Sequence, residues 1–180
     1  MTVGFAPQGA GSATDMRRPL SDIGPRFRAM AHGIGVGVAA TADSAGRPHT
    51  RVMQPVWVWE DGELTGWAST MADAPKLADL RKVPALSITY WEPGQDTCTA
   101  DCDVEVVTDD AARARAWDLF ALTPPPAGFD PGAHPTWDSP ASPTFAVLRL
   151  SPRWLRVMPG TLMTAGEGEV VTWRRPPGQG

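Results

Sequence analysis

The sequence has little cysteine, and its two thiols are poorly placed for either a disulfide or a metal. Cys98 and Cys102 are the only cysteines of the 180 residues. Residues four apart on one strand lie about 13 Å from each other, so these two cannot bridge. Zinc usually takes four ligands, whereas His32, His49 and His134 are scattered along the chain. The sequence therefore predicts no disulfide framework and no metal site, with both thiols as small core or interface residues.

Long apolar runs and an excess of basic charge are missing as well. No apolar run approaches the roughly 20 residues that span a bilayer, and residues 1–19 lack the apolar stretch of a signal peptide. The formal net charge is −4, which disfavours duplex nucleic acid as a partner. We therefore expect a cytoplasmic protein without a membrane or nucleic-acid partner.

The common catalytic arrangements of side chains are also absent. The chain shows no Ser-His-Asp arrangement, no pair of catalytic carboxylates and no phosphate-binding Gly-rich loop. Enzymes that lack such groups often leave the chemistry to a bound cofactor, while the protein supplies orientation, access and hydrogen bonds. If this protein is an enzyme, we expect it to be one of these.

What the sequence does contain is the pattern of one globular domain rich in strands. Hydrophobic residues make up 42% of the chain and charged residues 20%, as in globular proteins. An apolar run over 34–40 stops at the turn formers of 43–46, and 50–59 is rich in β-branched and aromatic residues. Asp61-Gly62 is a hairpin signal, after which 64–69 returns as a strand. The pattern predicts a meander of three antiparallel strands.

The end of this meander suits a phosphate group. Ser69-Thr70 leaves the third strand, and Asp73 followed by Pro75 marks a helix start, with the aspartate as N-cap. Lys76 falls in the first turn of that helix, together with exposed backbone N–H groups. Arg51 lies on the neighbouring strand and is expected to converge on the same place. Hydroxyl, ammonium and guanidinium donors in one place favour a phosphate ligand.

Turn and capping signals divide the rest of the chain. The further elements that we expect are helices over 21–30, over 75–82 and after 109, and strands over 85–91, 97–108, 144–158 and 169–173. We expect residues 1–19 to be a disordered segment and residues 174–180 to be a frayed tail.

The stretch 123–143 stands out because it holds seven prolines, which exclude a helix or a central strand. A loop of this length in a compact domain is usually functional or disordered. Phe129, His134 and Trp137 could fold it over a ligand as a lid, or one or two of these aromatic rings could pin a surface excursion. His134 is a candidate for an acid–base group.

The order of these pieces resembles one known family. An N-terminal helix, then ATADSAGRPHTRVM, then VWVWEDGELTGWAS with a lysine following, then LRKVPALSITY, is similar to the pyridoxamine 5′-phosphate oxidase-like, FMN-binding split-barrel family. The resemblance covers roughly residues 20–158. It implies a mainly β (α+β) fold, a six-stranded antiparallel split β-barrel with a few flanking helices, as a single domain over 20–173. It also implies a homodimer with the flavin at the subunit interface.

The resemblance carries site residues over position by position. Arg51 and Lys76 match the phosphate-binding Arg and Lys of the family, and Ser69-Thr70 matches hydroxyl positions near the ribityl phosphate. Val52 and Met53 match the strand beside the isoalloxazine ring, and backbone groups as far as Gln54 are expected to tune that ring. Trp154 falls near the aromatic position of the last barrel strand.

Two departures from the family pattern bear on function. An Arg-x-His substrate motif is missing from residues 158–180, which argues against oxidation of vitamin B6. Asp73 stands where many relatives have a basic or hydroxyl residue, and a carboxylate N-cap would compete with a phosphate for the same N–H groups.

The resemblance implies an FMN-dependent oxidoreductase with hydride transfer through flavin N5 and a small, planar or apolar substrate. Two alternatives stay open. One is an F420-dependent reductase on the same fold, whose longer anionic tail could use Arg47, Arg51, Lys76, Arg81 and Lys82. The other is a non-catalytic stress protein that binds flavin or haem.

Overall fold

The computed structural model describes residues 16–178 of the chain. The helices are α1 Leu20–Ile34, α2 Pro75–Leu80, α3 Asp110–Leu122, the 3-10 helix η1 Pro131–Ala133 and α4 Thr161–Ala165. The strands are β1 Met16–Arg17, β2 Gly37–Ala42, β3 Pro48–Met53, β4 Val56–Glu60, β5 Glu63–Met71, β6 Ala85–Trp91, β7 Thr97–Val107, β8 Phe145–Met158 and β9 Val171–Arg174. The expectation of a mainly β fold with a few flanking helices is confirmed.

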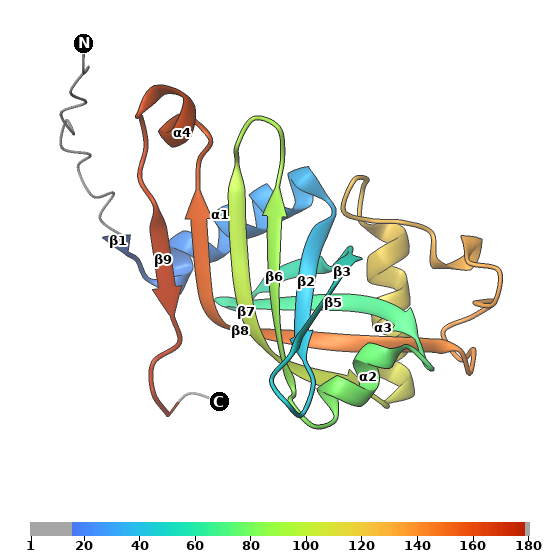
Figure 1. Ribbon diagram of the computed structural model, residues 1–180. Helices are drawn as coiled ribbons and strands as arrows, with labels where there is room; N and C mark the ends of the chain where they lie inside the picture. The colour runs from blue at the N-terminus through green and yellow to red at the C-terminus, as the bar shows by residue number, and fades with distance from the viewer. Residues whose placement is uncertain (1–15, 179–180) are drawn as a thin grey trace, which may run out of the picture.

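The strands form one strongly bent sheet in which β8 is shared by two arms (Figure 1). One arm runs in the order β1-β9-β8-β7-β6-β2-β3, and the other leaves β8 through β5 to β4. The first half of β8 pairs with β5, and the second half pairs with β9. Between Asp101 and Cys102 of β7, which pair with Trp154 and Pro152 of β8, the register shifts at a β-bulge. The sheet has nine strands rather than six, because the short strands β1 and β9 extend it at one edge and residues 50–59 form two strands, β3 and β4.

The predicted three-stranded meander is wrong in one respect. Residues 50–59 form two strands, β3 and β4, interrupted at Gln54-Pro55, because a proline cannot donate to a strand ladder. The result is two hairpins, β2–β3 and β4–β5, which are not paired with each other within the described residues. The barrel is therefore split between β3 and β4.

Helix α1 covers this split and satisfies backbone groups that a neighbouring strand would otherwise pair. Arg28 Nε donates to the Trp57 carbonyl oxygen at 3.0 Å, and the Trp57 N–H donates to His32 Nε2 at 2.9 Å. Burial, with the Arg28 charge acting in the same direction, lowers the pKa of His32 from 6.5 to about 4. The ring is therefore neutral and can accept this hydrogen bond.

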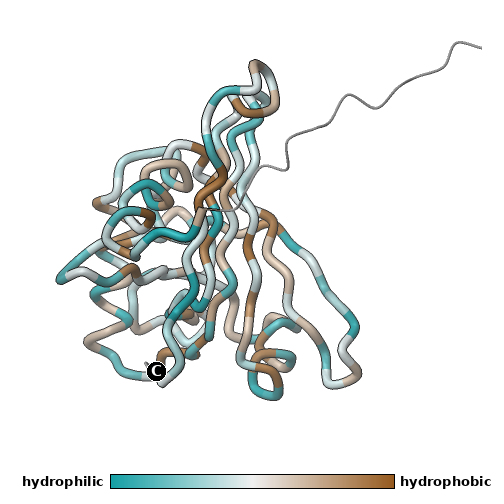
Figure 2. The backbone as a smooth tube through the Cα atoms, turned by 90° about the vertical axis from the view of Figure 1, so that its left-hand side faces the viewer, coloured by the Kyte–Doolittle hydropathy of each residue, from teal (hydrophilic) through white to brown (hydrophobic). Residues whose placement is uncertain are grey.

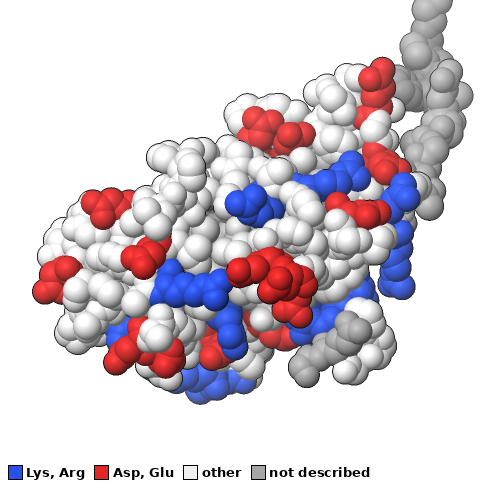
Figure 3. Space-filling view, turned by 180° about the vertical axis from the view of Figure 1, so that it is seen from behind, with Lys and Arg blue, Asp and Glu red and all other residues white. Residues whose placement is uncertain are grey.

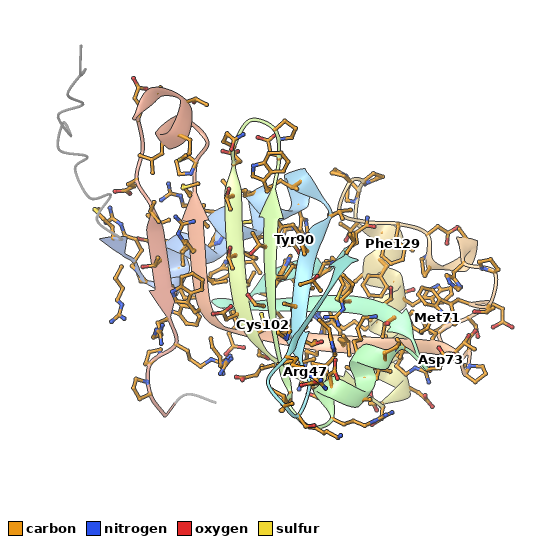
Figure 4. All side chains as sticks on the ribbon, in the orientation of Figure 1. Arg47, Met71, Asp73, Tyr90, Cys102 and Phe129 are labelled. Carbon is orange, nitrogen blue, oxygen red and sulfur yellow. The ribbon has the colours of Figure 1, made fainter. Side chains whose placement is uncertain are left out.

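The main core lies between α1 and the inner face of the sheet. Phe27 packs edge-on against Trp57 with ring centroids 4.9 Å apart, and Trp57 Nε1 donates to the hydroxyl of Tyr90 at 2.9 Å. Tyr90 and Cys102 both lie within the sheet (Figure 4). Cys98 and Cys102 are buried free thiols, as expected. Seen after a 90° turn, the strands carry alternating apolar and polar segments along their length (Figure 2), which is the pattern of a half-buried sheet.

A second core lies beside α3 and includes the proline-rich stretch 123–143. Asp109 caps α3 through the Ala112 N–H, and Phe120 of this helix is buried. The loop is pinned by two aromatic residues: Phe129 stacks on Phe120, and Trp137 packs edge-on against Phe145. These two contacts pack the loop against the second core.

The chain ends differ from expectation. Residues 1–15, in the segment expected to be disordered, lie outside the described residues, but Met16–Arg17 forms β1 and pairs with β9. The backbone pairing with β9 fixes this part of the segment. At the other end, β9 runs to Arg174, and Arg175 is held by Asp103 at 2.9 Å, so the expected fraying does not begin at residue 174.

The surface carries mixed charge. On the face opposite to that of Figure 1, acidic and basic side chains are interspersed (Figure 3), in keeping with the net charge of −4. No helix within residues 16–178 combines the length and hydrophobicity that a membrane crossing requires. In the same residues, no group of three potential metal-ligating side chains comes together.

Candidate functional site

Strand β3 sends alternate side chains to opposite faces of the sheet, which separates two roles. Arg51 and Met53 face the side of the barrel interior and α2, because Arg51 pairs with Ala39, which is fully buried. Val52 faces outward and is 68% exposed. The family-matched strand therefore gives one cation to the mouth of the barrel and one apolar side chain to the outer face.

A chain of hydrogen bonds fixes the guanidinium of Arg51 at this mouth. Arg51 Nη2 donates to Thr41 Oγ1 at 2.8 Å, and Thr41 Oγ1 donates to Asp79 Oδ2 of α2 at 3.2 Å. His49 Nδ1 lies 3.0 Å from the same Asp79 oxygen. The hydrogen bond from His49, with that from Thr41, lowers the pKa of Asp79. The guanidinium of Arg51 thus donates to two neutral acceptors, Thr41 Oγ1 and the Ala39 carbonyl oxygen.

Lys76 reaches the same region from the first turn of α2. Its Nζ donates to Thr70 Oγ1 at 2.5 Å, and Thr70 is buried. Burial lowers the pKa of Lys76, and the positive charge of Arg51 lowers it further. Burial also lowers the pKa of Arg51, although Asp79 acts in the opposite direction. Within residues 16–178, no carboxylate lies within the 4.0 Å of an ion pair with either cation. Two partly desolvated cations therefore lie near each other here, and neither charge is paired with a carboxylate within residues 16–178.

The expected role of Asp73 is wrong. The N-cap of α2 is Ala74, with no side-chain cap, and Pro75 opens the helix as expected. Asp73 is exposed and lies beside the start of α2 (Figure 4). Because its carboxylate does not bind the first N–H groups of the helix, it does not compete with a phosphate in the way the sequence indicates.

The structure does not bring every expected residue to this cluster. Ser69 lies on the opposite face of β5 from Thr70, on the side of Trp67 and the second core. Trp154 is half-buried on β8 and pairs with Asp101 of β7. Along the sheet, β7, β6 and β2 lie between β8 and β3.

Gln54 and His134 both take part in the organisation of the proline-rich loop. Gln54 Nε2 donates to the carbonyl oxygen of Pro126 at 2.8 Å. His134 stacks on Trp137 with ring centroids 4.2 Å apart, and its Nδ1 accepts from the Thr136 N–H at 3.3 Å. Neither contact involves the two cations, so the candidacy of His134 as an acid–base group stays a prediction.

The sequence analysis did not identify three residues of the network around Arg51, because they belong to no motif: Thr41, His49 and Asp79. Thr41 and His49 face each other across the β2–β3 hairpin, so the turn at 43–46 could have placed them together. Asp79 follows Lys76 by three residues on α2, which is the spacing of one helical face. The sequence therefore indicated that Asp79 lies on the same helical face as Lys76, but it did not indicate that Asp79 contacts β2.

The basic side chains proposed for a longer anionic tail are arranged unevenly. Arg47 lies at the end of the β2–β3 hairpin (Figure 4) and is paired with Asp43 at 2.7 Å. Arg81 and Lys82 are exposed just after α2. Of the five cations considered, Arg51 and Lys76 are the two that the structure shows partly buried.

Solved structures of other proteins share this fold. Solved structures of similar fold include a Clostridium acetobutylicum protein related to general stress protein 26 (13% identity, TM-score 0.62, covering 86% of this chain and 95% of that one). Another is a pyridoxamine 5′-phosphate oxidase-related, FMN binding protein from Nostoc punctiforme (16%, 0.62, 91% and 94%). A third is a heme binding protein from Mycobacterium smegmatis (19%, 0.58, 88% and 59%). At such identities the likeness concerns the fold alone.

Sequence comparison supplies the family. No curated protein matches the sequence significantly. The sequence profile described as pyridoxamine 5′-phosphate oxidase matches residues 23–158, which run from α1 to the end of β8. Because this match spans well over half of the chain and the fold agrees with it, the chain belongs to the pyridoxamine 5′-phosphate oxidase family.

Proposed function

We propose that the protein binds FMN, with the phosphate held between β3 and α2. The observation that carries this proposal is the convergence of Arg51 and Lys76, both partly buried and neither within ion-pair distance of a carboxylate in the described structure. A phosphate dianion would offset their mutual repulsion and the cost of their desolvation, and Thr70 offers a hydroxyl beside them. Family membership and an FMN-binding structural neighbour support the same ligand.

We place the isoalloxazine ring along β3, beside Val52, Met53 and Gln54. Beyond its pairing with β2, this strand has no partner among the described strands, so its other edge leaves backbone groups free for the polar rim of a ring. The ring would then lie next to the phosphate site on the same strand.

We further propose a homodimer formed through the outer face of β2, β3 and β6. Val38 faces Val52 across the hairpin, and Trp91 lies further along the same face of β6. These side chains are 55%, 68% and 56% exposed, an apolar surface of the kind that interfaces cover. Trp154 shares this face of the sheet, so a second copy packed there would bring an aromatic residue toward the cofactor strand.

The proposed activity is that of an FMN-dependent oxidoreductase acting on a small substrate. Bound FMN supplies hydride transfer through N5, and the protein binds the phosphate, orients the ring and limits access. The Arg-x-His motif for pyridoxine phosphate is missing from residues 158–180, so we do not assign vitamin B6 oxidation to this chain.

F420 is the second candidate cofactor, and one observation favours FMN over it. The charge of Arg47 is already compensated by Asp43, which weakens the extended basic groove that a longer anionic tail needs. The non-catalytic alternative, a flavin- or haem-binding stress protein, would use the same barrel without turnover.

The absorption spectrum of the purified protein tests the proposal, together with mass spectrometry of the chromophore that heat releases. An FMN spectrum with steady turnover of a reduced nicotinamide would support the oxidoreductase. A colourless protein that binds F420 or haem but not FMN in titrations would overturn the assignment, and FMN binding without turnover would favour the non-catalytic role.

A further inference from the structure

The side-chain amide of Gln54 is committed to one segment of the proline-rich loop. Its Nε2 lies 2.8 Å from the carbonyl oxygen of Pro126, 3.2 Å from that of Ala127 and 3.4 Å from that of Gly128. An amide nitrogen has two N–H donors, so the two shorter contacts use its full capacity. Gln54 thereby ties the end of β3 to a segment more than seventy residues away in sequence.

The same segment is fixed from two other sides. The Phe129 N–H donates to the Phe120 carbonyl oxygen at 2.9 Å, and the two rings stack with centroids 5.1 Å apart. At the end of α1, Gly35 has φ +84°, and a Cβ placed there would lie 2.5 Å from the Pro126 oxygen. Only a glycine allows this approach. The segment 124–129 is therefore a wall held by α1, α3 and β3.

This wall offers a ligand almost no hydrogen-bond donors and no charge. Residues 124–129 read Pro-Pro-Pro-Ala-Gly-Phe, and proline has no N–H. The N–H groups of Gly128 and Phe129 are already bonded within the loop and to α3. In this segment only Ala127 keeps an N–H that is not engaged within the described structure, and Ala127 is 1% exposed.

We infer that residues 124–129, anchored by Gln54, form the substrate-facing wall at the ring end of the cofactor site and select neutral, planar substrates over anionic ones. This inference rests on the proposed placement of FMN along β3. An anionic group brought against the wall loses water and gains neither a cation nor a donor, which is costly. A neutral ring loses little water and gains apolar contact. Gln54 acts as a positioning residue here, because it contacts the wall and not the reacting atoms.

Hydrogen exchange in the cofactor-free protein tests the anchor independently of FMN. Gln54→Leu removes both donors at nearly constant volume, and amide exchange of residues 127–129 should rise at least tenfold. The matched control is Gln95→Leu, because Gln95 Nε2 also donates to a proline carbonyl, that of Pro93 at 3.3 Å, but on the β6–β7 turn. Gln54→Ala serves as a second variant if Gln54→Leu does not fold. Unchanged exchange in the Gln54 variant would overturn the anchor.

Oxidation of the reduced FMN-loaded protein by two quinones tests the selectivity. Under anaerobic conditions, FMN reduced with one equivalent of dithionite gives two electrons and two protons to menadione, which is neutral, or to a naphthoquinone sulfonate, which is anionic. Each rate is divided by that of free reduced FMN, which removes the difference in quinone potential. We expect the wild-type protein to favour the neutral quinone at least tenfold, and Gln54→Leu to lose most of this preference, with Gln95→Leu unchanged.

The outcomes separate the two proposals. A preference that survives in Gln54→Leu despite faster exchange would show that the wall does not face the substrate. A wild-type preference near one would refute the selectivity. If the wild-type protein binds no FMN, the proposed function fails and the substrate role of the wall fails with it, while the exchange result still decides whether Gln54 is the anchor.

Discussion

Replacing Lys76 with methionine should separate cofactor binding from fold stability. The ammonium of Lys76 is half-buried, donates to Thr70 and is repelled by the charge of Arg51. In the cofactor-free protein, its removal loses one hydrogen bond but relieves both the desolvation of a charge and a repulsion between like charges. These effects oppose each other, so we expect the free energy of unfolding to change by less than about 1 kcal/mol.

With a phosphate bound, the ammonium of Lys76 becomes favourable, because Lys76 and Arg51 are then each attracted to the phosphate. The loss of one charge-assisted hydrogen bond should weaken FMN binding by about 1.5–3 kcal/mol, or roughly ten- to 150-fold in Kd. Titration of FMN fluorescence measures this loss, and urea unfolding of the cofactor-free protein measures stability. Lys82→Met is the matched control, because it removes the same charge from an exposed residue just after α2.

Three results would refute this reasoning. An unchanged Kd for Lys76→Met would mean that the phosphate does not bind between β3 and α2. An equal loss of FMN affinity in Lys76→Met and Lys82→Met would mean that only the overall positive charge matters, an effect that salt screens. A large loss of stability in cofactor-free Lys76→Met would show that the lysine is primarily a structural contact to Thr70.

Further predictions concern the split barrel and its outer face. Because the pKa of His32 is about 4 in the folded chain and near 6.5 in the unfolded chain, the unfolded chain binds the extra proton between these pH values. Stability should therefore fall as pH drops from 6.5 toward 4, by about 1–2 kcal/mol after discounting for partial exposure. Urea midpoints at both ends of this window should show a smaller difference for His32→Gln, and an equal difference would contradict the assignment. Tyr90→Phe leaves the buried Trp57 Nε1 without its acceptor and should cost about 1–3 kcal/mol in urea unfolding; a neutral result would mean that water replaces the hydroxyl. Val52→Glu puts a charge in the proposed dimer face and should give a monomer by light scattering, and a persistent dimer would place the interface elsewhere.

Local sequence signals predicted most individual elements, because those signals act within a few residues. A helix begins directly after residue 109, and Pro75 opens α2, as expected. The order of elements also sufficed to indicate the family, since strands, turns and basic residues follow one another along this chain in the same order as in the family. The N-cap at Asp73 failed because a capping preference worth about 1 kcal/mol is weak beside the tertiary contacts of so short a helix.

The sequence by itself thus determined the mainly β fold class and the family, and it predicted the pair of cations, Arg51 and Lys76. Only the tertiary structure decided what surrounds them. It brought Thr41 of β2 and Asp79 of α2 behind Arg51, and it decided that the Thr70 face of β5, rather than the Ser69 face, meets Lys76. These contacts depend on strand register and on pairing between segments that are distant in sequence. Because side chains alternate along a strand, the register decides which side chains face the site. No local pattern in a single sequence encodes that choice.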